Sequence, residues 1–142
     1  MWRAFIAITA LAIAGCAQIP PSAEEIEAKK MEAVPGKAVV YIVQNPLGSY
    51  SAGLAFDDST QITTYPGTFY RWVTAPGTRT IRSAEGNLNA SVRLQVEAGK
   101  IYFVQHWVTG IRGSTTDSRL SRVDEKTGRQ LVASGTLCCG SR

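Results

Sequence analysis

The sequence contains one histidine and three cysteines, too few to supply the chemistry of most enzymes. No further His, Cys or carboxylate residues stand at metal-ligand spacing around His106, so no metal site is predicted. No serine lies in a G-x-S-x-G pattern, and no C-x-x-C pair occurs. These absences predict a protein that is not an enzyme and has no cofactor.

A long hydrophobic run is also lacking. The uncharged apolar stretch at residues 4–14 is roughly half of the ~20 residues that a helix needs to cross a membrane. It follows the positively charged Arg3 and has the form of a signal segment.

This stretch ends at Ile13-Ala14-Gly15-Cys16, which resembles the lipobox of bacterial lipoproteins. The resemblance implies that residues 1–15 are a lipoprotein signal peptide and that Cys16 becomes the acylated first residue, carrying palmitate-type chains. Several acyl chains would hold the protein on a membrane, because each buried CH₂ contributes about 0.8 kcal/mol. Two alternatives remain: an ordinary secretory signal with Cys16 as an incidental thiol, or a buried helix.

Ala17 follows the lipidated position. Among lipoproteins of the enterobacterial type, a residue other than Asp there implies the outer membrane, so we expect a lipid-anchored envelope protein facing the periplasm. An exported chain without a nucleic-acid-binding motif is not expected to bind nucleic acid. About 125 mature residues suffice for one domain.

Residues 16–36 are predicted to be a lipidated tether with a short helix. Ser22 and Glu25 have the spacing of a capping box, and Glu25 and Lys29 can pair across one helical turn. Apolar residues are sparse here, so the helix is expected to be weak.

Residues 37–132 are predicted to form the folded domain, because short β-type segments alternate with turn signals. The pattern indicates an all-β fold, a single antiparallel β-sandwich of about seven strands. The expected strands are residues 38–44, 52–56, 61–65, 69–75, 78–84, 88–97 and 100–108. Residues 38–44 and 100–108 are apolar on both faces and are therefore expected to be central. Residues 120–132 fit either a hairpin or a helix that begins at Asp124.

The tail at residues 133–142 is predicted to be irregular, and it contains Cys138 and Cys139. Adjacent cysteines form either a strained ring, a bond to another chain, or two free thiols. We expect free thiols on a loose tail.

Short pieces between residues 34 and 132 resemble a family of small bacterial lipoproteins known only as a domain of unknown function. They are Pro35-Gly36-Lys37-Ala38, Ala75-Pro76-Gly77, Glu97-Ala98-Gly99-Lys100, and Leu120 with Val123-Asp124-Glu125 and Gly128. The resemblance implies a β-sandwich core and carries over no catalytic residues. Asp57-Asp58 replaces the Asp-Gly hairpin that is usual in the family.

Some polar and aromatic residues invite a functional interpretation, but structural roles are expected for them. His106 is predicted to be a hydrogen-bonded structural residue, and Asp57-Asp58 a turn rather than a calcium site. Exposed aromatic residues would suit a surface for sugars or a partner, although core positions are more usual for them. These aromatic residues are Tyr70, Trp72, Tyr102 and Trp107.

Arg71, Arg82 and Arg93 are a candidate partner surface. Each is on the face of its predicted strand opposite to the apolar residues. If the strands are neighbours, the three arginines therefore share one exposed face of the sheet. The sequence therefore predicts a non-enzymatic binding or structural module of the cell envelope, with an envelope protein or peptidoglycan as partner. One alternative is a small-ligand-binding β-sandwich lipoprotein, which would require a pocket. The other is an enzyme without a recognisable motif.

Overall fold

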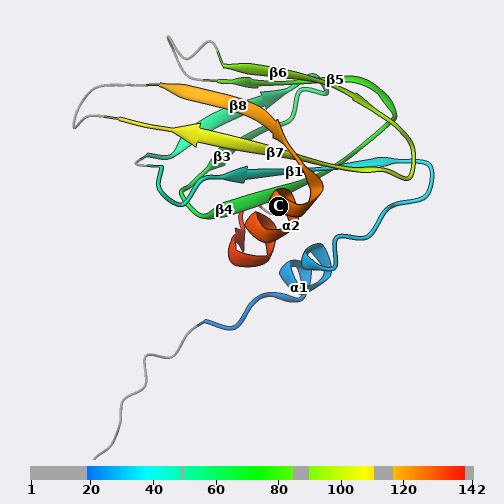
Figure 1. The fold of residues 1–142 in the computed structure, drawn as a ribbon, viewed down its shortest axis with the longest axis horizontal. Helices are drawn as coiled ribbons and strands as arrows, with labels where there is room; N and C mark the ends of the chain where they lie inside the picture. Colours follow the sequence, from blue (N-terminus) through cyan, green and yellow to red (C-terminus); the bar gives the residue numbers. More distant parts are fainter. Residues whose placement is uncertain (1–18, 49, 85–89, 111–116, 140–142) are drawn as a thin grey trace, which may run out of the picture.

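The computed structural model describes residues 19–48, 50–84, 90–110 and 117–139. This part of the chain is mostly β-structure, arranged as two sheets with two short helices beneath one of them (Figure 1). The five-stranded sheet has the order β8-β7-β1-β4-β9, and the four-stranded sheet has the order β3-β2-β5-β6.

The five-stranded sheet contains β1 (Ala38–Gln44), β4 (Thr68–Thr74), β7 (Ile101–Val108), β8 (Ser118–Val123) and β9 (Thr136–Leu137). The four-stranded sheet contains β2 (Ala52–Phe56), β3 (Gln61–Thr64), β5 (Gly77–Ser83) and β6 (Ser91–Val96). The helices are α1 (Ala23–Lys29) and α2 (Glu125–Ser134).

The described residues form nine strands rather than about seven, because β9 is not predicted and β8 is predicted only if residues 120–132 form a hairpin. The prediction of a purely antiparallel arrangement is also wrong. Strand β1 runs antiparallel to β4 but parallel to β7, and β9 runs parallel to β4. The strand pattern alone does not show these directions, because they depend on how the connections cross the fold.

The main core lies between the two sheets and is built from alternate residues of the facing strands. Val40 and Ile42 of β1 pack there with Leu54, Ile81 and Leu94 of the four-stranded sheet, and all five are buried. Since side chains alternate along a strand, every second position of each strand contributes to this layer. The arrangement is sandwich-like.

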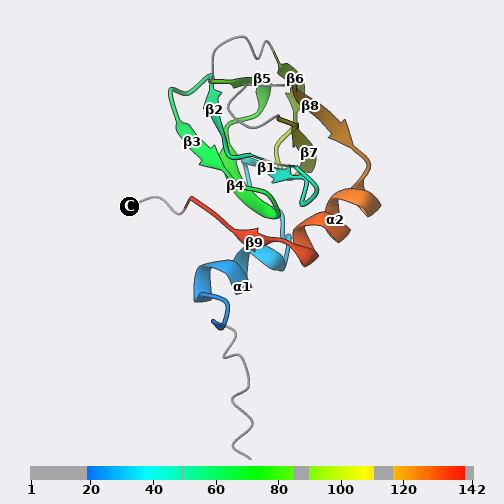
Figure 2. The same cartoon turned by 90° about the vertical axis from the view of Figure 1, so that its left-hand side faces the viewer.

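A second core lies between the other face of the five-stranded sheet and the helices. Val39, Tyr41 and Val43 of β1 pack there with Ala28 of α1 and Val132 of α2. Figure 2 shows both helices on this side of the sheet. The two cores explain why β1 is apolar on both faces, as the sequence indicates.

Both helices begin at capping residues. The Ser22 hydroxyl accepts a hydrogen bond from the Glu25 N–H at 3.1 Å, and the Asp124 carboxylate accepts one from the Thr127 N–H at 2.9 Å. Such caps satisfy backbone N–H groups that have no partner inside the helix. Of the two alternatives for residues 120–132, the helix that begins after Asp124 is the one present.

The helix within the predicted tether is packed against the domain. Ala28 is buried, and the Tyr41 hydroxyl donates a hydrogen bond to its carbonyl oxygen at 2.7 Å. Met31 and Val34 continue the same apolar contact. Residues 23–34 therefore belong to the folded unit, which begins earlier in the chain than residue 37.

Candidate functional site

A cavity of about 500 Å³ lies beside α1, where the five-stranded sheet ends at β4 and β9. Figure 2 shows β9 running between α1 and β4. The cavity is lined by Ala23, Glu24, Glu27 and Ala28 of α1, by Tyr70 and Arg71 of β4, and by Leu137, Cys138 and Cys139 of the C-terminal segment. Ligand sites in proteins commonly have volumes of ~300–1,000 Å³.

Arg71 supplies the positive charge of this cavity. It lies opposite Tyr41 in the β1–β4 register and is half-buried. Its Nε atom is buried, and among the described residues it has no hydrogen-bond partner. None of the ion pairs formed by described residues includes Arg71.

Tyr41 connects Arg71 with α1. Burial raises the pKa of the Tyr41 hydroxyl above its usual value, while the hydrogen bond and charge of the nearby Arg71 guanidinium oppose this rise. The hydroxyl therefore stays protonated at neutral pH, as its hydrogen bond to the Ala28 carbonyl requires. Together these contacts fix α1 over the wall that contains Arg71.

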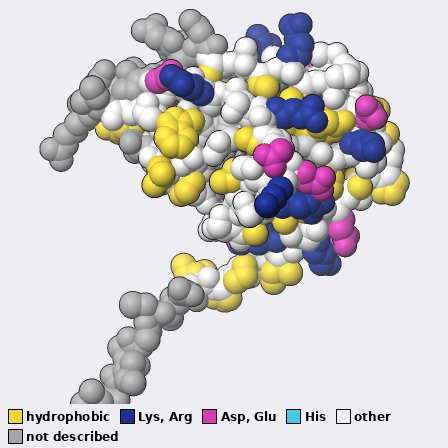
Figure 3. Space-filling model, viewed as in Figure 1, with side chains coloured by type: hydrophobic (Ala, Val, Ile, Leu, Met, Phe, Trp, Pro, Cys, Tyr) yellow, Lys and Arg dark blue, Asp and Glu magenta, His cyan; other side chains and the backbone are white. Residues whose placement is uncertain are grey.

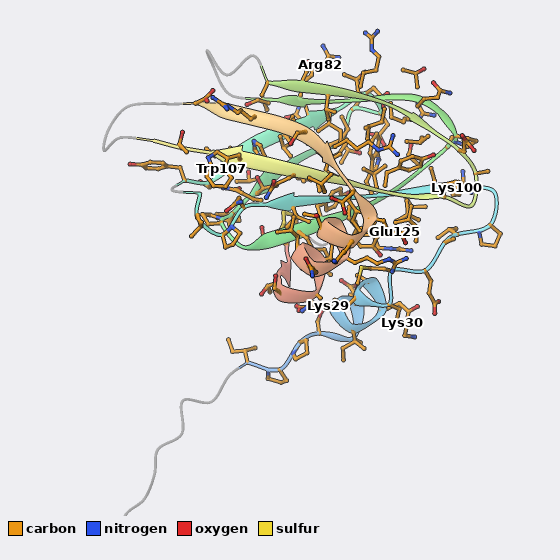
Figure 4. The ribbon with its side chains drawn as sticks, in the orientation of Figure 1. Lys29, Lys30, Arg82, Lys100, Trp107 and Glu125 are labelled. Carbon is orange, nitrogen blue, oxygen red and sulfur yellow. A yellow bond between two sulfur atoms is a disulfide. The ribbon has the colours of Figure 1, made fainter. Side chains whose placement is uncertain are left out.

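The negative charges of the cavity come from α1. Glu27 pairs with Lys30 and is mostly exposed, whereas Glu24 forms no ion pair with any described residue. Glu25 points away from this set, because it is buried and pairs with Lys29 at 2.7 Å. Figure 4 shows Lys29 and Lys30 on this helix, below the five-stranded sheet.

The C-terminal wall contains a disulfide between the neighbouring residues Cys138 and Cys139. The expected free thiols on a loose tail are therefore not what the structure shows. The segment is held in place because Cys138 N–H donates to the Phe69 carbonyl at 2.9 Å and Thr136 N–H donates to the Gly67 carbonyl at 3.0 Å. The C-terminal segment, predicted to be irregular, therefore forms strand β9 at Thr136–Leu137.

The three predicted surface arginines do not share one sheet. Arg71 is on β4, under α1, whereas Arg82 and Arg93 are on β5 and β6 of the four-stranded sheet. These two are exposed on the outer face, where the register brings Arg93 opposite Thr80, two residues from Arg82. Figure 4 shows Arg82 pointing away from the helices, and Figure 3 shows Lys and Arg side chains in dark blue along that upper edge.

The face of β4 that contains Arg71 was expected to face solvent, and this prediction is wrong. Phe69, on the same face, is completely buried in the second core. The reason is that the helices cover this side of the sheet. Three of the four candidate surface aromatics also have core roles: Trp72 and Tyr102 are buried, and Tyr70 packs against the main core.

Trp107 is the fourth aromatic candidate and lies towards the end of β7, away from α1 (Figure 4). It is only half-buried. Yellow, hydrophobic side chains gather at this end of the face shown in Figure 3. Trp107 is not among the residues that line the cavity beside α1, so it is not part of that site.

His106 lies on β7, among buried polar side chains, and does not line the cavity beside α1. It is completely buried, and its ring nitrogens contact the hydroxyl groups of Thr64 and Ser118. Burial lowers the pKa of His106 from 6.5 to about 4. It is therefore the neutral, hydrogen-bonded histidine that the sequence indicates.

Asp57 and Asp58 stabilise a turn and its surroundings. The Asp58 carboxylate accepts hydrogen bonds from the Thr60 N–H at 3.0 Å and from Trp72 Nε1–H at 2.9 Å. Burial would raise the pKa of Asp58, but these hydrogen bonds outweigh it, and the pKa is lowered. Among the described residues, no cluster of His, Cys, Asp and Glu is suited to hold a metal ion.

The lipid-attachment prediction at Cys16 lies outside the described residues, as do residues 1–15. Within the part that is described, no helix has the length and hydrophobicity needed to cross a membrane.

The cavity beside α1 cannot be predicted from the sequence, because three separate segments of the chain form it. Only the adjacent cysteines gave a local signal, since neighbouring cysteines are unusual enough to mark the C-terminal wall. No family model and no curated protein matches this chain. The resemblance to small lipoproteins of unknown function therefore stays a prediction.

Proposed function

We propose that this chain is a membrane-anchored envelope lipoprotein whose folded domain is a non-enzymatic binding module. The observation that carries the proposal is the cavity beside α1, which combines acidic side chains with an arginine that forms no ion pair with a described residue. Among the candidate functions, a small-ligand-binding module of sandwich-like architecture fits this cavity best, because polar groups converge on a space of ligand size.

The anchor is proposed to be a lipid on Cys16, with the outer membrane as location and the domain facing the periplasm. The lipobox-like Ile13-Ala14-Gly15-Cys16 supports this part of the proposal. Mass spectrometry of the N-terminal peptide tests it directly. Acylated Cys16 as the first residue is the expected result, and an intact Met1 or an unmodified Cys16 would contradict it.

A second candidate function is docking of an envelope protein or peptidoglycan on the four-stranded sheet. Arg82 and Arg93 favour it, since both are exposed and close together on the same outer face. A basic face attracts anionic partners.

Photo-crosslinking in living cells separates the two sites. A photoreactive amino acid replaces either Ala23, which lines the cavity, or Arg82, which lies on the other sheet. Adducts at position 23 are expected if the cavity is the binding site, whereas adducts only at position 82 would move the function to the basic face. Absence of adducts at both positions would contradict a binding module.

A further inference from the structure

We propose that the cavity beside α1 binds a zwitterion of amino-acid or short-peptide size, with its carboxylate at Arg71 and its ammonium group at Glu24. This inference rests on the proposed binding function and specifies the ligand chemistry.

The first argument is the separation of opposite charges. Arg71 and the α1 glutamates line the same cavity, yet no ion pair joins Arg71 to Glu24 or Glu27. In a protein without a ligand role, such groups gain most by approaching each other. Here the cavity keeps them apart and leaves space for a molecule with both charges.

The second argument is the unmet demand of Arg71. A guanidinium carries five N–H donors, and a buried donor without a partner is costly. The Arg71 Nε atom is in this position among the described residues, and none of their carboxylates forms an ion pair with the side chain. A ligand carboxylate in the cavity would bind the part of the guanidinium that lines it, and its negative charge would offset the cost of the buried Nε–H.

The third argument is the edge of β4 at the cavity, which no described strand pairs beyond Phe69. The pairing of β9 with β4 ends at Phe69 and Leu137. The carbonyls of Gly67 and Phe69 accept hydrogen bonds from the C-terminal segment, so the alternation of β4 directs the backbone of Arg71 to the same edge. A peptide backbone would find a donor and an acceptor there.

The same arrangement selects against ligands with one charge. A simple anion would meet Arg71 but would be repelled by Glu24, and a polyamine would be repelled by Arg71. The cavity volume of about 500 Å³ accommodates a dipeptide. A dipeptide with free ends has a carboxylate for Arg71 and an ammonium group for Glu24.

The test uses the full mature chain in detergent and a pool of X-Ala dipeptides in which X covers the common amino acids. The pool is prepared with free ends, with an N-acetyl group, or with a C-terminal amide. Binding is followed by ¹H–¹⁵N NMR. We expect the free dipeptides to shift signals of α1 and β4 and to bind at least about tenfold more tightly than either blocked form.

Two variants test which charged group of the ligand Arg71 and Glu24 each bind. With Arg71→Gln, the free and amidated pools should bind equally, because the carboxylate has lost its partner. With Glu24→Gln, the free and acetylated pools should bind equally. Lys100→Gln and Glu97→Gln are matched controls, since these exposed residues lie in one turn and do not line the cavity. Arg71→Lys, which keeps the charge, should retain part of the preference and serves if Arg71→Gln does not fold.

Equal affinity of the three pools, or no binding by free dipeptides up to about 10 mM, would overturn the zwitterion inference. These results are distinguishable from failure of the proposed function. Adducts at position 23 in cells without dipeptide binding would leave the binding function standing and reject only this ligand class. Dipeptide binding without adducts at positions 23 and 82 would support the ligand chemistry and contradict the function in cells.

Discussion

The Nε2 atom of His106 lies 2.9 Å from the hydroxyl oxygen of Ser118, inside the fold. On the other side of the ring, Nδ1 lies 3.1 Å from the Thr64 hydroxyl, which itself donates to the Ala52 carbonyl. The single Thr64 hydroxyl hydrogen is thereby used, so Nδ1–H must donate to Thr64. Nε2 then accepts from Ser118, and this set of bonds requires a neutral ring.

Acidification is therefore expected to destabilise the protein through His106. The unfolded chain binds the proton below pH 6.5, whereas the folded chain binds it only below about pH 4. The contribution of neutral His106 to the free energy of unfolding is thus complete above pH 6.5, and it is lost as the pH falls towards 4. At about 1.4 kcal/mol per pH unit, the loss reaches about 3 kcal/mol. Urea unfolding at a series of pH values measures it.

The pH 5–6.5 interval isolates this effect, because carboxylates titrate mostly at lower pH. His106→Gln is the control: its stability should be lower at neutral pH but flat across this interval. A wild-type curve that is flat there would show that His106 can take up a proton without disrupting its bonds to Thr64 and Ser118.

Tyr41→Phe should loosen α1. The substitution removes the hydrogen bond to the Ala28 carbonyl, and a lost buried hydrogen bond of this kind costs about 1–2 kcal/mol. We expect a lower free energy of unfolding and faster hydrogen exchange of the α1 amides. Tyr65→Phe is the matched control, since Tyr65 is 52% exposed. Unchanged exchange in α1 would mean that its apolar contacts alone fix the helix.

Gly128→Ala should destabilise the domain although alanine favours helices. A Cβ atom at this position of α2 would lie 2.4 Å from Cβ and 2.1 Å from Cγ of Phe103. Such overpacking costs about 1–3 kcal/mol, more than the ~1 kcal/mol gained in helix propensity. Thermal unfolding measures the balance, with Gln130→Ala as a control at an exposed position of the same helix. An increased midpoint would show that Phe103 moves aside freely.

Reduction of the Cys138–Cys139 disulfide should have little effect on global stability. A disulfide stabilises mainly by closing a loop in the unfolded chain, and neighbouring residues enclose almost none. We expect the free energy of unfolding to change by less than about 0.5 kcal/mol when a reductant is added. The double variant Cys138→Ser/Cys139→Ser should behave like the reduced protein.

Intact-mass measurement without reductant checks the disulfide itself. The chain should be lighter by two hydrogen atoms than the reduced chain. Recovery of the fully reduced mass would contradict the pairing, and a large drop in the unfolding midpoint on reduction would contradict the account of its energetics.

Sequence reasoning identifies the central strands because their side chains face apolar surroundings on both sides. Strand β1 has the predicted bounds, Ala38–Gln44, and every residue in it is buried. Strand β7, Ile101–Val108, lies beside it in the predicted range. A run that is apolar on both faces requires two covering layers, and this requirement is a local property of the sequence.

The environment of Arg71 could not be found in this way. Alternation shows which residues share a face of β4, but not what covers that face. Here α1 and α2 cover it, and these helices come from opposite ends of the chain. The cavity depends on the same long-range packing, since Glu24, Arg71 and Cys139 are brought together only by the fold.

The docking of α1 on the sheet sets how far the domain extends from a membrane. If Cys16 holds the lipid, as we propose, only the residues from Cys16 to Ala23 separate the anchor from the packed helix. The seven Cα-to-Cα steps from Cys16 to Ala23 span at most about 25 Å when the chain is fully extended. The cavity beside α1 would then stay within a short radius of the lipid headgroups. Its ligands would be sampled from the thin layer next to the membrane rather than from the whole compartment.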